Sequence, residues 1–170
     1  MKKGLKTILP KAMASKISVP SDNIKSSDSK VIGNVKFQVI PQSAEKRLFL
    51  QDRSTNHSDV DIEQANQLIC YELRIQNVDQ TDILDNPSNL SYEQKVDYFS
   101  SKLGRRIKLM VNLDTIPCAM YHFERNFGVA PYQSIQLGFP YDKDWKGESH
   151  HILIRDDYFG FGDIHLESTY

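Results

Sequence analysis

The chain has 170 residues, of which 39% are hydrophobic and 25% are charged, a composition typical of globular rather than disordered proteins. A chain of this length is expected to form one domain that folds without disulfides or metals. No apolar run approaches the roughly 20 residues that a membrane-spanning helix needs. The composition therefore favours a small globular protein and argues against a helical membrane protein.

The net charge of −1 is unevenly distributed along the chain. Residues 1–36 contain eight lysines against two aspartates, whereas residues 37–170 contain 13 basic and 20 acidic residues. We predict a flexible basic leader over residues 1–30, followed by a β-rich globular domain over residues 31–170. The leader is either a solubilising tail or an arm that docks on an anionic surface. The location is predicted to be cytoplasmic if the sequence is complete, and envelope or secreted if an export signal was removed.

The first half of the domain contains two segments in which apolar and polar residues alternate. Residues 31–40 predict a strand that ends before Pro41, and residues 69–75 predict the clearest strand of the chain. Residues 48–50 are a short apolar segment that could pair with the first strand. A period of two places the apolar side chains on one face of a sheet.

One segment, residues 91–104, carries the signals of a helix. Ser91 is a natural N-cap and Gln94 completes a capping box. Gly104 is placed to end the helix in a left-handed conformation. The predicted apolar stripe falls at helical spacing and consists of Tyr92, Val96, Phe99 and Leu103.

Strand patterns resume after the helix, separated by turn residues. The predicted strands cover residues 107–111, 115–123, 134–139, 150–155 and 161–167, with a tight turn at Asn112-Leu113-Asp114. Their number and spacing predict a mainly β fold. We expect an antiparallel β-sandwich, immunoglobulin-like or related, with one short α-helix.

Several aromatic residues fall in predicted loops rather than in strands. Tyr and Trp are enriched at protein interfaces, so these residues are candidates for contact with a partner protein. The alternative is that they form small apolar clusters beneath the loops. The candidates are Phe127, Tyr132, Tyr141, Trp145 and Tyr158.

The last predicted hairpin contains residue types that bind divalent metals. His151, His165 and Asp163 would approach one another if the two strands pair around the turn at residues 156–160. Imidazole and carboxylate groups suit zinc or a similar ion. The spacing matches no closed motif, so no cofactor is predicted, and a divalent metal at this hairpin remains the alternative. Adjacent histidines on a strand point to opposite faces, which limits a site to one of His150 and His151.

The two cysteines give no motif for redox or zinc chemistry. Cys70 and Cys118 lie in strand-like segments, and we expect buried thiols, although a disulfide stays open in an oxidising compartment. Cys118 and His122 would share a face of a strand but stand about 13 Å apart. That distance is too long for a thiolate–imidazole pair.

No arrangement of residues fixes a reaction, so the sequence favours a non-enzymatic binding or assembly module that is a subunit of a larger protein complex. Nucleic acid is not an expected partner, because the domain is acidic and Arg105-Arg106 stands alone at a helix end. Two alternatives stay open. One is a metal-assisted hydrolase that uses the C-terminal hairpin, and the other is a β-barrel carrier of a small apolar ligand.

Overall fold

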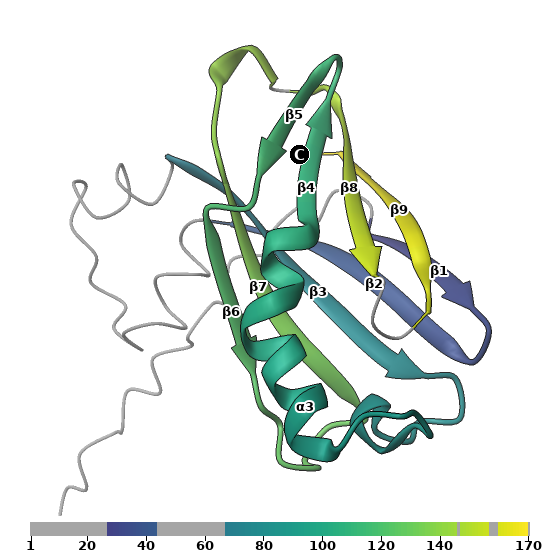
Figure 1. Cartoon of the computed structure of the whole chain (residues 1–170). Coiled ribbons are helices and arrows are strands. Elements are labelled where there is room, and N and C mark those ends of the chain that lie inside the picture. The colour runs from purple at the N-terminus through teal and green to yellow at the C-terminus, as the bar shows by residue number, and fades with distance from the viewer. Residues whose placement is uncertain (1–26, 44–66, 146, 157–159, 170) are drawn as a thin grey trace, which may run out of the picture.

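The computed structural model describes residues 27–43, 67–145, 147–156 and 160–169 of the chain. The fold is mainly β, with two antiparallel sheets and one short helix, as Figure 1 shows. The predicted mainly β class is therefore confirmed. The predicted leader up to residue 26 and the predicted strand at residues 48–50 lie outside the described residues.

The first sheet has five strands in the order β1-β2-β3-β7-β6. Its longest strands, β3 and β7, pair over nine residues from Leu68↔Pro140 to Gln76↔Tyr132. The strands of this sheet are β1 (Asp28–Ile32), β2 (Val35–Gln42), β3 (Leu68–Asn77), β6 (Met120–Glu124) and β7 (Tyr132–Pro140).

The second sheet has four strands in the order β5-β4-β8-β9. The strands β8 and β9 form the predicted C-terminal hairpin, and β4 joins β5 through the predicted turn at Asn112 and Leu113. The strands are β4 (Ile107–Val111), β5 (Asp114–Pro117), β8 (Ser149–Asp156) and β9 (Gly162–Thr169). Short 3-10 turns η1 (Ile83–Asp85) and η4 (Lys143–Trp145) lie in the connections.

Residues 31–40 do not form the single strand that their alternation predicts. The chain reverses at Gly33 and Asn34, so that Ile32 pairs with Val35 and the segment becomes the hairpin β1–β2. Gly33 has a φ of 58°, a left-handed conformation that glycine adopts without steric cost. The alternation of apolar residues continued through this turn and concealed it.

Residues 115–123 are likewise split, between β5 in the four-stranded sheet and β6 in the five-stranded sheet. The crossing occurs at two adjacent residues. The amide of Cys118 donates to Ile107 in β4, and the amide of Ala119 donates to Gly138 in β7. The chain therefore changes sheets within one peptide, which no feature of the local pattern indicates.

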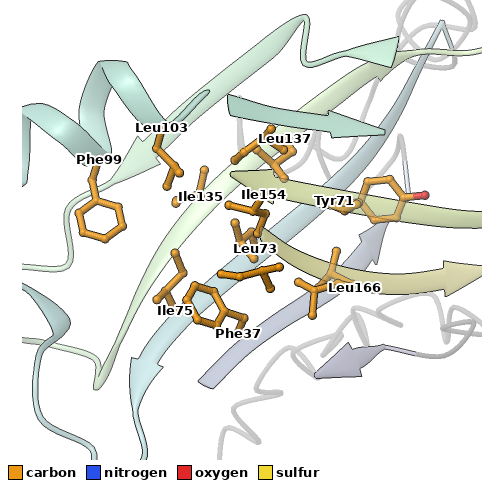
Figure 2. Packing of buried hydrophobic residues seen from close by; sticks show 14 of the residues in the cluster. Phe37, Tyr71, Leu73, Ile75, Phe99, Leu103, Ile135, Leu137, Ile154 and Leu166 are labelled. Carbon is orange, nitrogen blue, oxygen red and sulfur yellow. The ribbon is translucent and has the colours of Figure 1, made fainter. Parts of the chain in front are cut away.

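The apolar faces of both sheets contribute to one hydrophobic core. Alternate residues of β3 and β7 face it, and so do alternate residues of β4, β8 and β9, which is the packing that a period of two requires. Figure 2 shows side chains from the two sheets in contact, among them Leu73, Leu137 and Ile154. Phe99 and Leu103 from the helical segment close one end of this core.

The predicted helix forms, but with three geometries in succession. It consists of α3 (Tyr92–Asp97), one turn of π-helix η2 (Tyr98–Lys102) and the 3-10 turn η3 (Leu103–Arg106). The Ser91–Gln94 capping box is confirmed, because each side chain bonds the backbone N–H of the other. A π-turn closes an i→i+5 hydrogen bond and so accommodates one more residue than a turn of α-helix.

The buried face of the helix differs from the predicted stripe at two aromatic residues. Phe99 and Leu103 are buried as expected, but Tyr92 is exposed and Tyr98 is buried instead. The Tyr98 hydroxyl donates to the Asp156 carboxylate of β8 at 2.5 Å, and burial raises the pKa of Tyr98 well above its ordinary value. The stripe was wrong at Tyr92 and Tyr98 because tertiary contacts, rather than helical period alone, chose the buried face.

Gly104 does not end the helix in a left-handed conformation as predicted. It lies within η3, and its role is to leave room for Tyr121. A Cβ atom at Gly104 would lie 2.6 Å from the Tyr121 ring. That ring lies against the helix, where the Tyr121 hydroxyl donates to the carbonyl of Phe99. Glycine is needed here for close approach, not for a positive φ.

Candidate functional site

The loop between β6 and β7, residues 125–131, carries apolar side chains that face solvent. Phe127 is 79% exposed and Val129 is 90% exposed. Phe127 has a φ of 49°, in the left-handed region that a bulky aromatic residue rarely occupies. A residue held in such a conformation costs about 1–3 kcal/mol, and such residues concentrate at functional sites.

Asn126 holds this loop in one conformation through hydrogen bonds in both directions. Its side-chain amide donates to the carbonyls of Ala130 at 2.7 Å and Tyr132 at 2.6 Å. Its side-chain oxygen accepts from the amide of Gly128 at 3.0 Å, and its main-chain carbonyl accepts from Val129 at 2.9 Å. The loop is therefore hydrogen-bonded internally, and Phe127 projects from an ordered backbone.

Gln133 also connects this loop to the segment that contains η1. The buried Gln133 amide donates to both carboxylate oxygens of Asp82, at 2.8 and 2.9 Å, and to the Asn126 side chain at 3.3 Å. Asp82 in turn caps η1 by accepting from the amide of Leu84 at 2.9 Å. Two connections far apart in the sequence therefore support each other beneath the loop.

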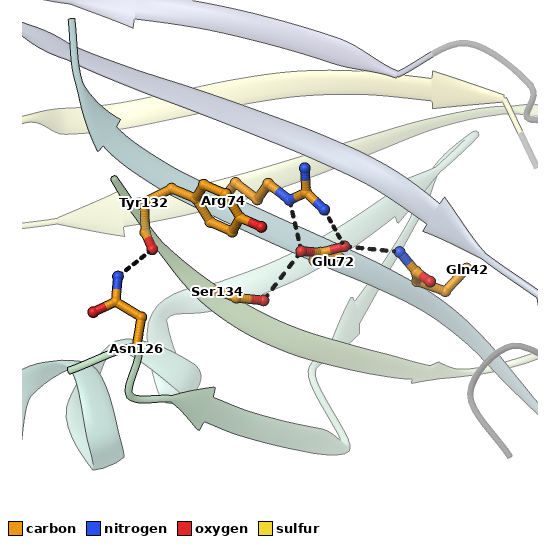
Figure 3. Close-up of polar contacts among 6 residues, drawn as sticks. All are labelled: Gln42, Glu72, Arg74, Asn126, Tyr132 and Ser134. Carbon is orange, nitrogen blue, oxygen red and sulfur yellow. Dashed lines mark hydrogen bonds and ion pairs between the residues drawn. The ribbon is translucent and has the colours of Figure 1, made fainter. Parts of the chain in front are cut away.

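A second support lies on the outward face of the five-stranded sheet, shown in Figure 3. The Tyr132 ring, whose carbonyl Asn126 binds, lies 4.5 Å from the Arg74 guanidinium carbon. Glu72, which is buried, accepts from Arg74 Nε at 2.6 Å and Nη2 at 3.1 Å. Hydrogen bonds to this carboxylate raise the pKa of Arg74.

Glu72 has two further donors, which fix its position at the centre of this face. The Gln42 amide donates to it at 3.1 Å from β2, and the Ser134 hydroxyl at 3.2 Å from β7. Three neighbouring strands are thus joined at one carboxylate. Charge-assisted hydrogen bonds of this kind are about twice as strong as neutral ones, so Glu72 holds β2, β3 and β7 together on this face.

Arg125 joins the loop to the start of the helix. Its guanidinium carbon lies 4.9 Å from the centre of the Phe127 ring, and its Nη2 donates to the Tyr92 hydroxyl at 3.4 Å. Tyr92 is 47% exposed. Within the described residues Arg125 forms no ion pair. We call the four exposed residues Tyr92, Arg125, Phe127 and Val129 the β6–β7 patch.

The structure separates the five aromatic residues that the sequence nominated for partner contact. Phe127 is largely exposed, and the Tyr132 ring lies against Arg74 on the outward face of the five-stranded sheet. Tyr141 and Trp145 are half-buried and pack against the main hydrophobic core. Tyr158 lies outside the described residues.

The other members of the patch were not nominated from the sequence. Tyr92 was assigned to the buried stripe, and Arg125 and Val129 carried no periodic signal. A signal was present in Asn126-Phe127-Gly128, since Asn and Gly mark turns with left-handed residues. That pattern would have indicated that Phe127 stands at the tip of a turn.

The predicted metal ligands are all on the outward face of the C-terminal hairpin but are dispersed along it. His151 stands opposite Glu167, His165 stands opposite Leu153, and Asp163 pairs with Arg155 at 3.7 Å. Within the described residues, no group of three or more His, Cys, Asp or Glu side chains is placed to hold a metal ion. His150 faces the core instead and is fully buried.

The two cysteines are thiols in positions that do not favour nucleophilic chemistry. Cys70 is buried, and Cys118 is half-buried at the crossing between the sheets. Cys118 Sγ lies 3.0 Å from the carbonyl of Met120, and burial raises the pKa of the thiol. A thiol with a raised pKa has little thiolate at neutral pH, and the thiolate is the reactive form.

A small hollow lies between the helix and the two sheets, at Tyr98, Asp156 and Phe161. Its volume is about 10 Å³, which is room for roughly one water molecule. Small-molecule pockets usually enclose several hundred Å³. This hollow does not offer the space that a carrier of an apolar ligand needs.

Comparison with known proteins assigns no family to this chain. No protein-family model matches it, and no curated protein or solved structure matches it. In the described part of the chain, no helix is long and apolar enough to cross a membrane. The site must therefore be interpreted from its own geometry.

Proposed function

We propose that this chain is a non-enzymatic protein-binding module, a subunit of a larger complex that docks through the β6–β7 patch. The observation that carries the proposal is Phe127, an aromatic ring that is 79% exposed on a backbone with a φ of 49°. A surface loop could bury such a ring by rotating the side chain inward, and it could avoid the strained φ by carrying glycine at this position. Hydrogen bonds from Asn126 instead hold the ring in solvent.

Such an arrangement suits insertion of Phe127 into an apolar pocket of a partner protein. Burying a Phe side chain contributes about 1.5–3 kcal/mol. Because the loop is already ordered by its own hydrogen bonds, little conformational entropy is lost on binding. Interface residues that dominate affinity are enriched in Tyr, Trp and Arg, which agrees with Tyr92 and Arg125 beside the ring.

The charge of Arg125 indicates which kind of side chain borders the partner's pocket. Arg125 is exposed, stacks on Phe127 and forms no ion pair among the described residues. A carboxylate of the partner placed beside the pocket would complete it with a charge-assisted hydrogen bond. The proposed partner is thus a protein with an apolar pocket bordered by an acidic side chain.

The scaffold that presents the patch is proposed to be a β-sandwich. The support is that residues from both sheets share one core, with polar residues alternating outward along the strands. Strand β9 also contacts the first sheet at its edge, where the amide of Glu167 donates to Asp28 of β1 at 2.8 Å. An immunoglobulin-like topology has no further support.

The test compares two variants that each remove one exposed apolar side chain. Phe127→Ala removes the proposed anchor, whereas Leu113→Ala removes a side chain that is 100% exposed on the β4–β5 turn, away from the patch. Tagged full-length proteins are used to recover partners from native extract, and the affinity of each variant for the recovered partner is then measured by calorimetry. We expect Phe127→Ala to weaken binding at least tenfold and Leu113→Ala to leave it unchanged.

The same comparison has outcomes that would contradict the proposal. Equal binding by the two variants would exclude the β6–β7 patch as the docking surface. A wild-type protein that recovers no partner and sediments as a monomer would exclude the binding role itself. Equal melting temperatures of the two variants would show that any loss of binding is not a loss of folding.

A further inference from the structure

Three buried polar side chains lie inside the core, at the end where β8 begins and β9 ends. His150 faces inward from β8, and Ser168 stands opposite it in β9. Tyr71 comes from β3 in the other sheet, and its hydroxyl lies 2.6 Å from His150 Nδ1. All three residues are buried. Figure 2 shows the Tyr71 hydroxyl directed away from the other labelled core side chains.

His150 also contacts the connection between β7 and β8. Its Nε2 lies 3.4 Å from the main-chain carbonyl of Trp145, the last residue of η4. In the neutral ring with hydrogen on Nε2, Nδ1 accepts from Tyr71 and Nε2 donates to Trp145. One uncharged side chain therefore joins β3, β8 and the Trp145 segment.

The surroundings of His150 disfavour its charged form. Burial, the largest effect, lowers its pKa, and the neighbouring His151 lowers it further. The Trp145 carbonyl and Glu148 act in the opposite direction. Its neighbours in the adjacent strands, Val111 in β4 and Ser168 in β9, are uncharged.

We propose that His150 is a pH-sensitive clamp: the neutral ring holds the two sheets together at this end by accepting the Tyr71 hydroxyl at Nδ1, and protonation of Nδ1 removes that acceptor and releases β3 from β8. The clamp lies at the opposite end of the molecule from the β6–β7 patch (Figure 1), so loss of one does not entail loss of the other. Acidification would loosen the Tyr141 and Trp145 side chains, which pack against the core here.

The direction of the pH dependence follows from proton linkage. The ordinary pKa of histidine is about 6.5, and the folded-state pKa of His150 is lower. The released state therefore binds the proton more tightly than the folded state. The stabilising contribution of His150 is complete above about pH 6.5 and is lost as the pH falls below that value toward the folded pKa.

The chain contains a single tryptophan, Trp145, which reports on this segment directly. Fluorescence of the full chain is recorded from pH 7.5 to 5, a window above the ordinary titration of carboxylates near 4. We expect a reversible red shift of Trp145 emission with a midpoint below 6.5. His150→Gln, which keeps a polar side chain but does not titrate, should abolish the transition. His151→Gln, the adjacent and exposed residue, is the matched control and should keep it.

Three outcomes overturn the clamp. They are a wild-type spectrum without a transition in this window, a transition that persists in His150→Gln, and a transition that His151→Gln abolishes. If His150→Gln does not fold, imidazole signals of the wild-type protein are followed by NMR. A His150 midpoint at or above 6.5, or one that the Trp145 indole signal does not follow, rejects the proposal.

Discussion

The two ends of this molecule use polar groups in opposite ways. At the β6–β7 end, hydrogen bonds of Asn126 hold the aromatic ring of Phe127 out in solvent. At the other end, the buried pair Tyr71–His150 lies between the sheets, and Tyr141 and Trp145 pack inward beside it. A polar network can thus expose an aromatic side chain or help to bury one, and the sequence of the loop alone does not say which.

The energetic consequences of the two ends should differ accordingly. A buried hydrogen-bonded group is costly to leave without its partner, because desolvation is not recovered. An exposed side chain contributes little to stability and is available for binding. Substitutions at the His150 end should therefore affect folding, and substitutions at the Phe127 end should affect association.

The largest expected effect on folding comes from Tyr71→Phe. This change removes the hydroxyl that lies 2.6 Å from His150 Nδ1 in a fully buried position. We expect the free energy of unfolding at pH 7.5 to fall by about 1–3 kcal/mol. Tyr132→Phe is the matched control, because its ring supports Arg74 by stacking alone, and it should change stability by less than about 0.5 kcal/mol. Chemical denaturation measures both, and equal losses would show that the two ends do not differ.

Asn126→Ala should have an intermediate effect confined to the loop. The substitution removes the two hydrogen bonds to Ala130 and Tyr132 and the two from Gly128 and Gln133. Because the loop is exposed, water replaces part of what is lost, and we expect a cost of about 1 kcal/mol. Hydrogen exchange of the amides in residues 128–130 should accelerate while exchange in β3 stays unchanged. Unchanged exchange in the loop would contradict the role assigned to Asn126.

Phe127→Gly should have the smallest effect on folding and the opposite sign. Glycine tolerates a φ of 49° without strain, although it also increases the entropy of the unfolded chain. We expect the melting temperature to be unchanged or to rise slightly, with a gain of up to about 1 kcal/mol, while partner binding is lost. A clear loss of stability would show that the Phe127 ring contributes to the fold and is not reserved for a partner.

Local elements such as turns and helix caps were predicted more accurately than the exposure or burial of individual aromatic residues. The capping box at Ser91 and Gln94 and the turn at Asn112 and Leu113 were predicted correctly, because each depends on residues that are close in sequence. The exposure of Phe127 and the burial of Tyr98 depend on a π-turn, a loop conformation and contacts with other strands. The local pattern Asn126-Phe127-Gly128 indicates a turn, but not that the Phe127 ring is exposed, and no local pattern indicates the burial of Tyr98.

The faces of the C-terminal hairpin illustrate the same division. Alternation along a strand required that His150 and His151 point to opposite faces. Only the pairing of β8 with β4 and β9 decided that His150 faces Tyr71 and that His151 faces solvent. The pairing leaves His151, the predicted ligand, on the outward face and places His150 in the core.

By itself, the sequence determined the mainly β class, most strand positions, the start of the helix and the tight turns, because side-chain period and capping act between residues a few positions apart. Tertiary structure decided which sheet each strand joins, which face of the helix is buried and which aromatic residue stands in solvent. These depend on burial and hydrogen bonding between segments far apart in the chain, such as Cys118 at the crossing between the sheets and Tyr71 against His150.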